Sequence, residues 1–230
     1  MTNEFLIKDT TLIKYLGNAS DVMIPDGITS IGKRAFYECE HLKSVRIPRS
    51  VTKLDEAAFR GCINLTEITI GDSVEFIGEE CFYDCKSLAS AVVGNGVSYI
   101  RRAAFANCAK LTSVRIGKNV RAIELGVFCY CRKLTDIVIP DGVTKLGNNA
   151  FCDCSSLTSI TIPASVTHIG YGAFKGCNNL TIFACAVKKP ANWLVERGFL
   201  GLGSVKKDTY GNLMHWNPDN RFVVWGYKEK

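Results

Sequence analysis

The chain has 230 residues and a net charge of +6; 47% of its residues are hydrophobic and 22% are charged. This balance is typical of an ordinary globular protein and excludes a disordered chain. The basic residues are scattered and form no run that marks a nucleic-acid arm, so no nucleic-acid partner is expected. No apolar stretch approaches the roughly 18 residues that a membrane span needs, so no span is expected either.

Residues 1–20 are expected to form an amino-terminal β cap. In the stretch FLIKDTTLIKYLG, the apolar residues Phe5, Ile7, Leu12 and Ile13 can shield the end of a hydrophobic core. The same stretch has no basic region that leads into an apolar one, so no secretion signal is recognisable.

Residues 21–185 repeat with a period of 23 residues, which is the strongest pattern in the sequence. One phenylalanine recurs in every copy, at Phe36, Phe59, Phe82, Phe105, Phe128, Phe151 and Phe174. Cysteine and leucine columns that begin at Cys39 and Leu42 keep the same interval, as do aliphatic columns that begin at Ile28 and Ile31. The copies follow one another without an insertion, which predicts seven to eight structural repeats.

One copy, IPRSVTKLDEAAFRGCINLTEITI, divides into three pieces. In LTEITI, Ile68 and Ile70 alternate with Thr69, as a half-buried strand requires. Proline or glycine then turns the chain into a second short extended piece, V-T-x-L/I. The segment A-F-x-x-C places phenylalanine and cysteine on one face of a single helical turn.

A lone copy buries too little apolar surface to fold, so the copies are expected to stack. Stacking pairs their strands into a parallel sheet and predicts a mostly β solenoid. Eight strands are expected, the first with Val22 and Ile24 facing inward and the last with Phe183 and Cys185 in those places. At the usual strand spacing, this ladder is roughly 34 Å long.

The pattern IPxxVTxIGxxAFxxCxxLTxIxIP resembles the BspA-like leucine-rich repeats over residues 21–185. The opening FLIKDTTLIKYLGNASDVMIP resembles the amino-terminal cap of that family, and NPDNRFVVWGY resembles a carboxy-terminal ending. The resemblance implies a curved, right-handed leucine-rich-repeat solenoid. Its parallel β-sheet would form the concave face, with short strands and helical turns on the outer side. It also implies a protein of a host-associated bacterium that acts in adhesion or protein binding and has no catalytic residues.

Residues 186–230 are expected to form the carboxy-terminal cap. Six large apolar residues can shield the other end of the core: Trp193, Leu194, Trp216, Phe222, Val224 and Trp225. The alternative is that Lys188–Trp216 is a functional appendage. Any enzymatic activity would have to lie in that segment.

The eleven cysteines are expected to be free thiols. Seven belong to the column that begins at Cys39, with neighbours about 4.8 Å apart, whereas a disulfide needs Cβ atoms about 3.8 Å apart. Cys81 and Cys185 replace alanine and isoleucine, so they are interpreted as core residues. With no recognisable export signal, free thiols favour the cytoplasm; a surface or secreted location is expected if a leader has been removed.

Cys129 and Cys152 share an outer column that is expected to face solvent. Each lies two residues before a core cysteine, so the four thiols point in different directions and form no zinc site. Oxidation of the neighbouring Cys129 and Cys152 is an alternative to two free thiols. No metal and no cofactor are expected.

No catalytic constellation is found, so the protein is not expected to be an enzyme. The stretch GITSIGKR nearly matches a phosphate-binding loop, but Arg34 replaces the hydroxyl residue that holds magnesium. His41 and His168 fall in solvent-facing columns of distant repeats, and Glu79 and Glu80 are interpreted as part of a solvated outer face.

The outward columns remain as candidate binding surfaces. The first lies along the sheet and comprises Met23, Arg46, Thr69, Val92, Arg115, Val138 and Thr161. The second is the pair of neighbouring aromatic residues Phe76 and Tyr99. The predicted partner-binding residues are Arg46, Thr69, Val92, Arg115, Val138, Phe76 and Tyr99. They predict a non-catalytic module that binds a protein through its concave sheet; the alternative is a cell-surface adhesin or carbohydrate-binding protein with a glycan partner.

Overall fold

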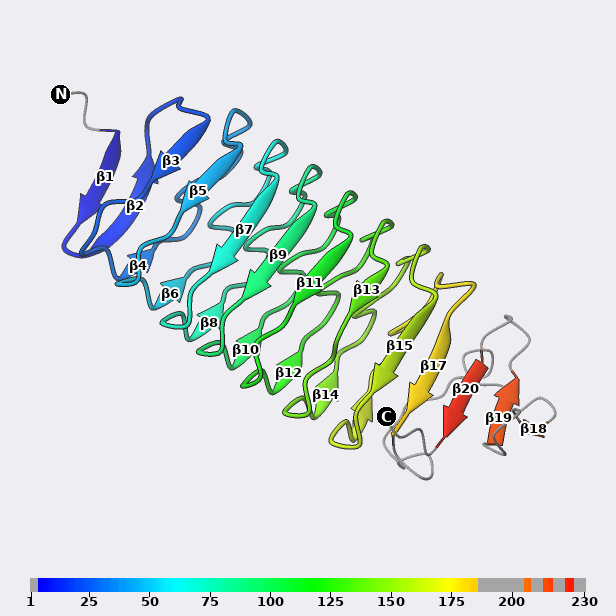
Figure 1. The fold of residues 1–230 in the computed structure, drawn as a ribbon. Coiled ribbons are helices and arrows are strands. Elements are labelled where there is room, and N and C mark those ends of the chain that lie inside the picture. Colours follow the sequence, from blue (N-terminus) through cyan, green and yellow to red (C-terminus); the bar gives the residue numbers. More distant parts are fainter. Residues whose placement is uncertain (1–3, 186–204, 208–212, 217–221, 226–230) are drawn as a thin grey trace.

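The computed structural model describes residues 4–185 and three further strands at 205–207, 213–216 and 222–225 (Figure 1). The described chain is a parallel β solenoid in which each repeat makes one coil, as the sequence predicts. The first strands of the coils are β3 (Asp21–Met23), β5 (Ser44–Arg46), β7 (Glu67–Ile70), β9 (Ser90–Val93), β11 (Ser113–Arg115), β13 (Asp136–Ile137), β15 (Ser159–Ile162) and β17 (Thr181–Ala184). Their outer surface is called the long-strand face below.

A second, shorter strand follows in each coil after the proline or glycine turn. These strands are β4 (Ser30–Ile31), β6 (Lys53–Leu54), β8 (Phe76–Ile77), β10 (Tyr99–Ile100), β12 (Ala122–Ile123), β14 (Lys145–Leu146) and β16 (His168–Ile169). They join the amino-terminal hairpin of β1 (Phe5–Lys8) and β2 (Thr11–Tyr15) in one nine-stranded sheet. The long strands instead fall into three sheets, with interruptions between β5 and β7 and between β13 and β15.

The outer segment of each coil forms successive tight turns rather than the expected helical turn. Within a coil, Ala35 N–H donates to the Gly32 carbonyl and Cys39 N–H to the Phe36 carbonyl. The intervening amides reach the next coil instead, as Phe36 N–H does to the Ala58 carbonyl at 2.7 Å. In an α-helix, every interior amide N–H donates to a carbonyl of the same segment. No helix is therefore present in residues 4–185.

The core is a stack of phenylalanine rings that runs through the coils. Rings of successive coils are nearly parallel, with centroids 4.9–5.7 Å apart and interplanar angles of 4–18°. Tyr15 stacks on Phe36 at 5.1 Å and so closes the stack at the amino-terminal end. Among the residues expected to shield that end, Leu12 is buried, but Ile7 and Ile13 are exposed, because Tyr15 and half-buried Phe5 take the place beside the stack.

The last described coil departs from the 23-residue period. Strand β17 pairs with β15 so that Phe183 lies opposite Thr161 and Ala184 opposite Ile162, a spacing of 22 residues. The buried residues are therefore Ile182 and Ala184, and the expectation that Phe183 and Cys185 face inward is wrong. The strand begins one residue early after Leu180, and this register keeps two apolar side chains on the core face.

Beyond β17, the long-strand sheet continues with β20 (Phe222–Trp225), which pairs with β17 in parallel. Strands β19 (Leu213–Trp216) and β18 (Val205–Lys207) follow in antiparallel order. The side chains predicted to shield this end, and the rest of the proposed Lys188–Trp216 appendage, lie outside the described residues.

Candidate interaction surface

The outward column of the long-strand face forms one row across the coils. Met23 lies beside Arg46, and Thr69, Val92 and Arg115 lie side by side on β7, β9 and β11. The side chains of Met23 and Val138 are 65% and 71% exposed, although both are apolar. Half-buried Phe183 extends the row beside Thr161. A strict 23-residue period assigns Phe183 to the inward face instead.

Several arginines of the described coils form no ion pair, and two of them lie in this row. Within residues 4–185, neither Arg46 nor Arg115 forms an ion pair. The column next to this row has acidic residues at the start of β3, β7 and β13, namely Asp21, Glu67 and Asp136. One of them, Asp21, accepts hydrogen bonds from Ser20 and Ser44 at 2.6 and 2.5 Å, which lower the pKa of its carboxyl group. The guanidinium groups therefore remain available to an external anion.

A cleft of about 540 Å³ opens beside Arg46. The ends of β3 and β5 and the turns that follow them form its walls, from Met23 to Gly27 and from Arg46 to Ser50. Pro25 and Pro48 make these walls rigid, while Arg46 and Arg49 provide positive charge. The sequence indicated Arg46 but not the cleft, because the space depends on how two coils stack.

Phe76 and Tyr99 lie on a different surface from the other predicted residues. They are neighbours in the short-strand sheet, on β8 and β10. Tyr99 is 43% exposed, and Phe76 is half-buried. The Lys53 ammonium lies 5.6 Å from the Phe76 ring centre, and the Arg101 guanidinium lies 5.4 Å from that of Tyr99. Both rings therefore already contact cations of the chain itself.

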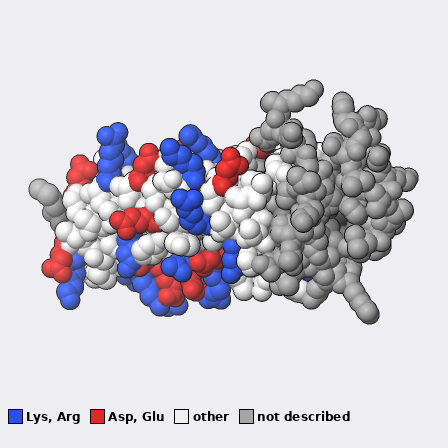
Figure 2. Space-filling model, turned by 90° about the horizontal axis from the view of Figure 1, so that it is seen from below, with Lys and Arg blue, Asp and Glu red and all other residues white. Residues whose placement is uncertain are grey.

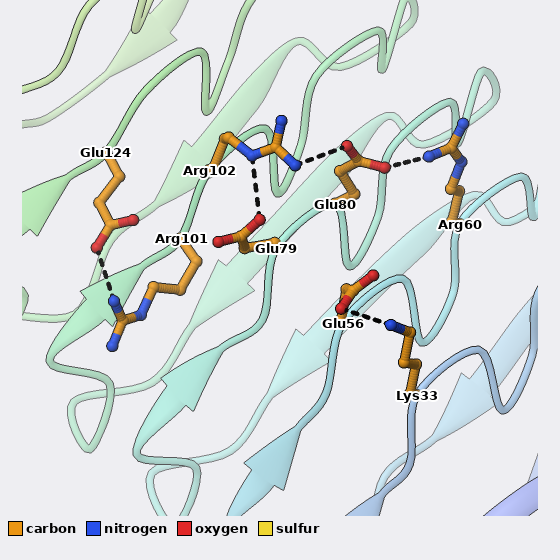
Figure 3. Close-up of polar contacts among 8 residues, drawn as sticks. All are labelled: Lys33, Glu56, Arg60, Glu79, Glu80, Arg101, Arg102 and Glu124. Carbon is orange, nitrogen blue, oxygen red and sulfur yellow. Dashed lines mark hydrogen bonds and ion pairs between the residues drawn. The ribbon is translucent and has the colours of Figure 1, made fainter.

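The outer turns carry ion pairs between successive coils (Figure 3). Arg102 forms ion pairs with Glu79 at 3.0 Å and with Glu80 at 3.4 Å, and Glu80 also forms an ion pair with Arg60. Lys33 pairs with Glu56 and lowers the pKa of that carboxyl group, and Arg101 pairs with Glu124. Glu79 and Glu80 are thus paired rather than merely solvated. On the face that Figure 2 shows, basic and acidic side chains are mixed along the described coils, with no large patch of one sign.

The cysteine column forms a ladder of hydrogen bonds inside the core. Six of its thiols donate to the phenylalanine carbonyl of the preceding coil at 3.1–3.2 Å, from Cys62 to Cys177. Burial raises the pKa of thiols such as Cys62, Cys108 and Cys131. Cys81 is buried, as expected for a core residue. Cys185 follows β17 and is half-buried, so its assignment to the core is wrong.

Three other side chains lie deeper than expected. Cys152 is only 7% exposed, although its column was expected to face solvent, and Cys129 is half-buried. His41 packs near the Tyr15 ring, with its Nε2 atom buried and without a hydrogen-bond partner among the described residues. No group of three or more potential ligands in the described residues is arranged to hold a metal ion. Within the same residues, no helix is long and apolar enough to cross a membrane.

Three solved structures show the same fold. A leucine-rich repeat protein of T. pallidum is 27% identical, with a TM-score of 0.60 and 79% of each chain covered. A leucine-rich cell surface protein of Faecalibacterium prausnitzii is 29% identical, with a TM-score of 0.71 over 97% of this chain and 59% of that one. A leucine-rich repeat protein of Eubacterium ventriosum is 26% identical, with a TM-score of 0.70 over 88% and 50%.

The present chain therefore spans only half to three fifths of the last two proteins. No curated protein sequence matches it significantly. The BspA type leucine-rich repeat region matches in six copies over residues 9–134 and 122–189, which is most of the chain. Together with the 23-residue coils, this match shows that the protein belongs to the BspA type leucine-rich repeat family.

Proposed function

We propose that the protein is a non-catalytic interaction module that holds a protein partner on its long-strand face. The repeat fold supports a binding scaffold, since stacked repeats create extended surfaces from positions that do not contribute to the core. Inward columns repeat the same few residue types, whereas the outward column changes from coil to coil. A partner can therefore be recognised through the outward column without any cost to the fold.

The observation that carries the proposal is the placement of two unpaired arginines beside apolar side chains on one face of the repeats. Arg60, Arg101 and Arg102 on the outer turns are neutralised by glutamates of neighbouring coils. Arg46 and Arg115 on the long-strand face have no such partner in residues 4–185; Arg46 lies beside exposed Met23 and Arg115 beside half-buried Val92. Arginine and apolar anchors together are typical of protein interfaces.

The spacing of the two arginines suggests the chemistry of the partner. They lie three coils apart, which is about 14 Å at the usual strand spacing. A partner that presents acidic side chains at this separation, with apolar groups between them, would meet both guanidiniums and Val92. The cleft beside Arg46 would take an apolar side chain of the partner next to one of its carboxylates.

The test is capture of proteins from cells of the source organism by the immobilised chain. We expect a partner that the wild type retains and the double variant Arg46→Glu/Arg115→Glu loses. The matched control is Lys145→Glu/Lys175→Glu, which changes the net charge equally at exposed positions away from the long-strand face. Equal loss in both double variants would show a general charge effect, and retention by both would contradict the proposed face.

A glycan is the second candidate partner, supported by the adjacent rings of Phe76 and Tyr99 in the short-strand sheet. Exposed aromatic faces stack on sugar rings, but here Lys53 and Arg101 occupy part of the surface of each ring. A glycan array that compares the wild type with Tyr99→Ala separates the two proposals. Sugar binding that disappears in Tyr99→Ala, and that persists in Arg46→Glu/Arg115→Glu, would favour the adhesin function.

A further inference from the structure

Cys129 and Cys152 occupy the same position in two successive coils, outside the core ladder of thiols. The backbone holds these coils in register on both sides of the pair. Phe128 N–H donates to the Ala150 carbonyl at 2.8 Å, and Tyr130 N–H donates to the carbonyl of Cys152 itself at 2.7 Å. The two cysteines therefore lie one coil spacing apart at equivalent positions of adjacent turns.

Access distinguishes this pair from the thiols of the ladder. Cys131 and Cys154, which belong to the same two coils, are fully buried, and each donates to a phenylalanine carbonyl. Cys129 is half-buried and lies on the outer turn, so it is the more accessible residue of the pair. Cys152 is 7% exposed, and its thiol donates to the Asp153 carboxylate at 3.2 Å.

The coil spacing allows these two sulfurs to join. Equivalent Cα atoms of stacked strands are roughly 4.8 Å apart, within the range of about 4.4–6.8 Å that disulfides span. The Cβ atoms must still approach to about 3.8 Å. Cys129 and Cys152 lie outside the core ladder, so their side chains can rotate toward each other, whereas the ladder thiols are held beside the phenylalanine stack by their carbonyl hydrogen bonds.

From this geometry we propose that Cys129 and Cys152 form a reversible disulfide that staples the two coils together under oxidising conditions. A low-molecular-weight disulfide such as oxidised glutathione supplies the oxidant. The Cys129 thiolate attacks one sulfur of that disulfide, forms a mixed disulfide and releases one glutathione thiolate. The Cys152 thiolate then attacks the Cys129 sulfur and releases the second. Two protein thiols lose two electrons and two protons, and the released thiolates take up the protons as two reduced glutathione molecules.

The bond would change how the solenoid opens. It links residues one coil apart, so the two coils can no longer separate when the chain unfolds, and the unfolded ensemble is restricted. Burial raises the pKa of both thiols, so thiol–disulfide exchange is slow at neutral pH. The disulfide therefore forms during prolonged oxidation rather than during a brief exposure to oxidant. The inference does not depend on the identity of a partner.

The test uses the full chain, reduced and then incubated with excess oxidised glutathione. We expect the thiol count to fall from eleven to nine and peptide mapping to find Cys129 joined to Cys152. Cys129→Ser and Cys152→Ser should each keep the chain free of any internal disulfide. Cys185→Ser, at another half-buried cysteine, should still lose two thiols. The oxidised wild type should unfold at a higher urea concentration than the reduced one, and the two serine variants at the staple should lose this difference.

Several results would overturn the proposal. One is the retention of eleven thiols, and another is a disulfide between ladder residues such as Cys39 and Cys62. A mixed glutathione disulfide that persists at Cys129 would show that Cys152 cannot complete the exchange. An unchanged urea midpoint in a protein with the mapped bond would overturn its role as a staple.

Discussion

The thiol of Cys108 donates a hydrogen bond at 3.2 Å to the carbonyl oxygen of Phe82, twenty-six residues earlier in the chain. Cys108 itself is fully buried, and the same contact recurs along the ladder. The column therefore needs a residue that is both small and apolar and also able to donate a weak hydrogen bond, which is what a free thiol provides.

Replacing Cys108 by alanine should destabilise the protein by about 1–2 kcal/mol, because the side chain leaves a small cavity and the Phe82 carbonyl loses a donor. The comparison is Cys129→Ala on the outer turn, where the side chain is only half-buried and a smaller effect is expected. Urea unfolding under reducing conditions measures both variants. A cost for Cys108→Ala no larger than that for Cys129→Ala would show that the ladder bond contributes nothing.

Alkaline pH should destabilise the fold through the same thiols. Burial raises the pKa of thiols such as Cys62, Cys108 and Cys131 in the folded chain, whereas an unfolded thiol titrates near pH 8.5. Their contribution to stability is complete below about pH 8.5 and is lost as the pH rises above it. Each thiol contributes a slope of about 1.4 kcal/mol per pH unit.

The measurement is the urea midpoint of the reduced protein between pH 7.5 and 9.5, below the range in which most lysines titrate. We expect a steep fall above pH 8.5. Cys108→Ala, with one buried thiol fewer, should show a shallower slope even though it starts from a lower stability. A flat profile would mean that the buried thiols ionise in the folded chain as easily as in the unfolded one.

Two glycines of one turn column should respond oppositely to alanine. A Cβ atom added at Gly117 would lie 2.6 Å from the carbonyl carbon of Gly94, which is backbone of the preceding coil and cannot move aside. A Cβ at Gly71 would meet nothing closer than the Ser73 hydroxyl at 3.8 Å. Gly117→Ala should therefore cost about 1–3 kcal/mol, while Gly71→Ala should be neutral or slightly stabilising. Thermal unfolding of both variants checks the contrast, and equal effects would contradict the close approach of these coils.

The inward columns could be predicted from the sequence because each inward residue contacts its own equivalents. Phe105, for example, stacks on Phe82 and Phe128, so a correct period identifies its neighbours without coordinates. The same reasoning placed Phe76 beside Tyr99 and Val92 beside Arg115. The period could not predict that Lys53 and Arg101 contact the rings of Phe76 and Tyr99, because the positions of these cations depend on side-chain conformation.

The mistaken expectations share a different cause. A-F-x-x-C has the same spacing in a helical turn and in a pair of tight turns. What excludes the helix is the donation of Phe36 N–H to another coil, which no single copy reveals. In the last coil, Leu180 keeps the 23-residue column while β17 begins one residue early, so an extrapolated column assigned Phe183 to the wrong face. The cleft beside Arg46 likewise depends on how far apart two turns stack.

The ion pairs of the outer turns should contribute little to stability despite their number. Arg102 bridges Glu79 and Glu80, but its side chain is 51% exposed and that of Glu79 is 48% exposed. Exposed pairs are screened by water and salt and typically contribute less than about 1 kcal/mol. Arg102→Gln should therefore lower the free energy of unfolding by less than about 1 kcal/mol, and the loss should shrink further in 1 M NaCl. A larger loss that is insensitive to salt would show that the Arg60–Glu80–Arg102 chain acts as a buried network, and the outer turns would then hold the coils together as strongly as the core does.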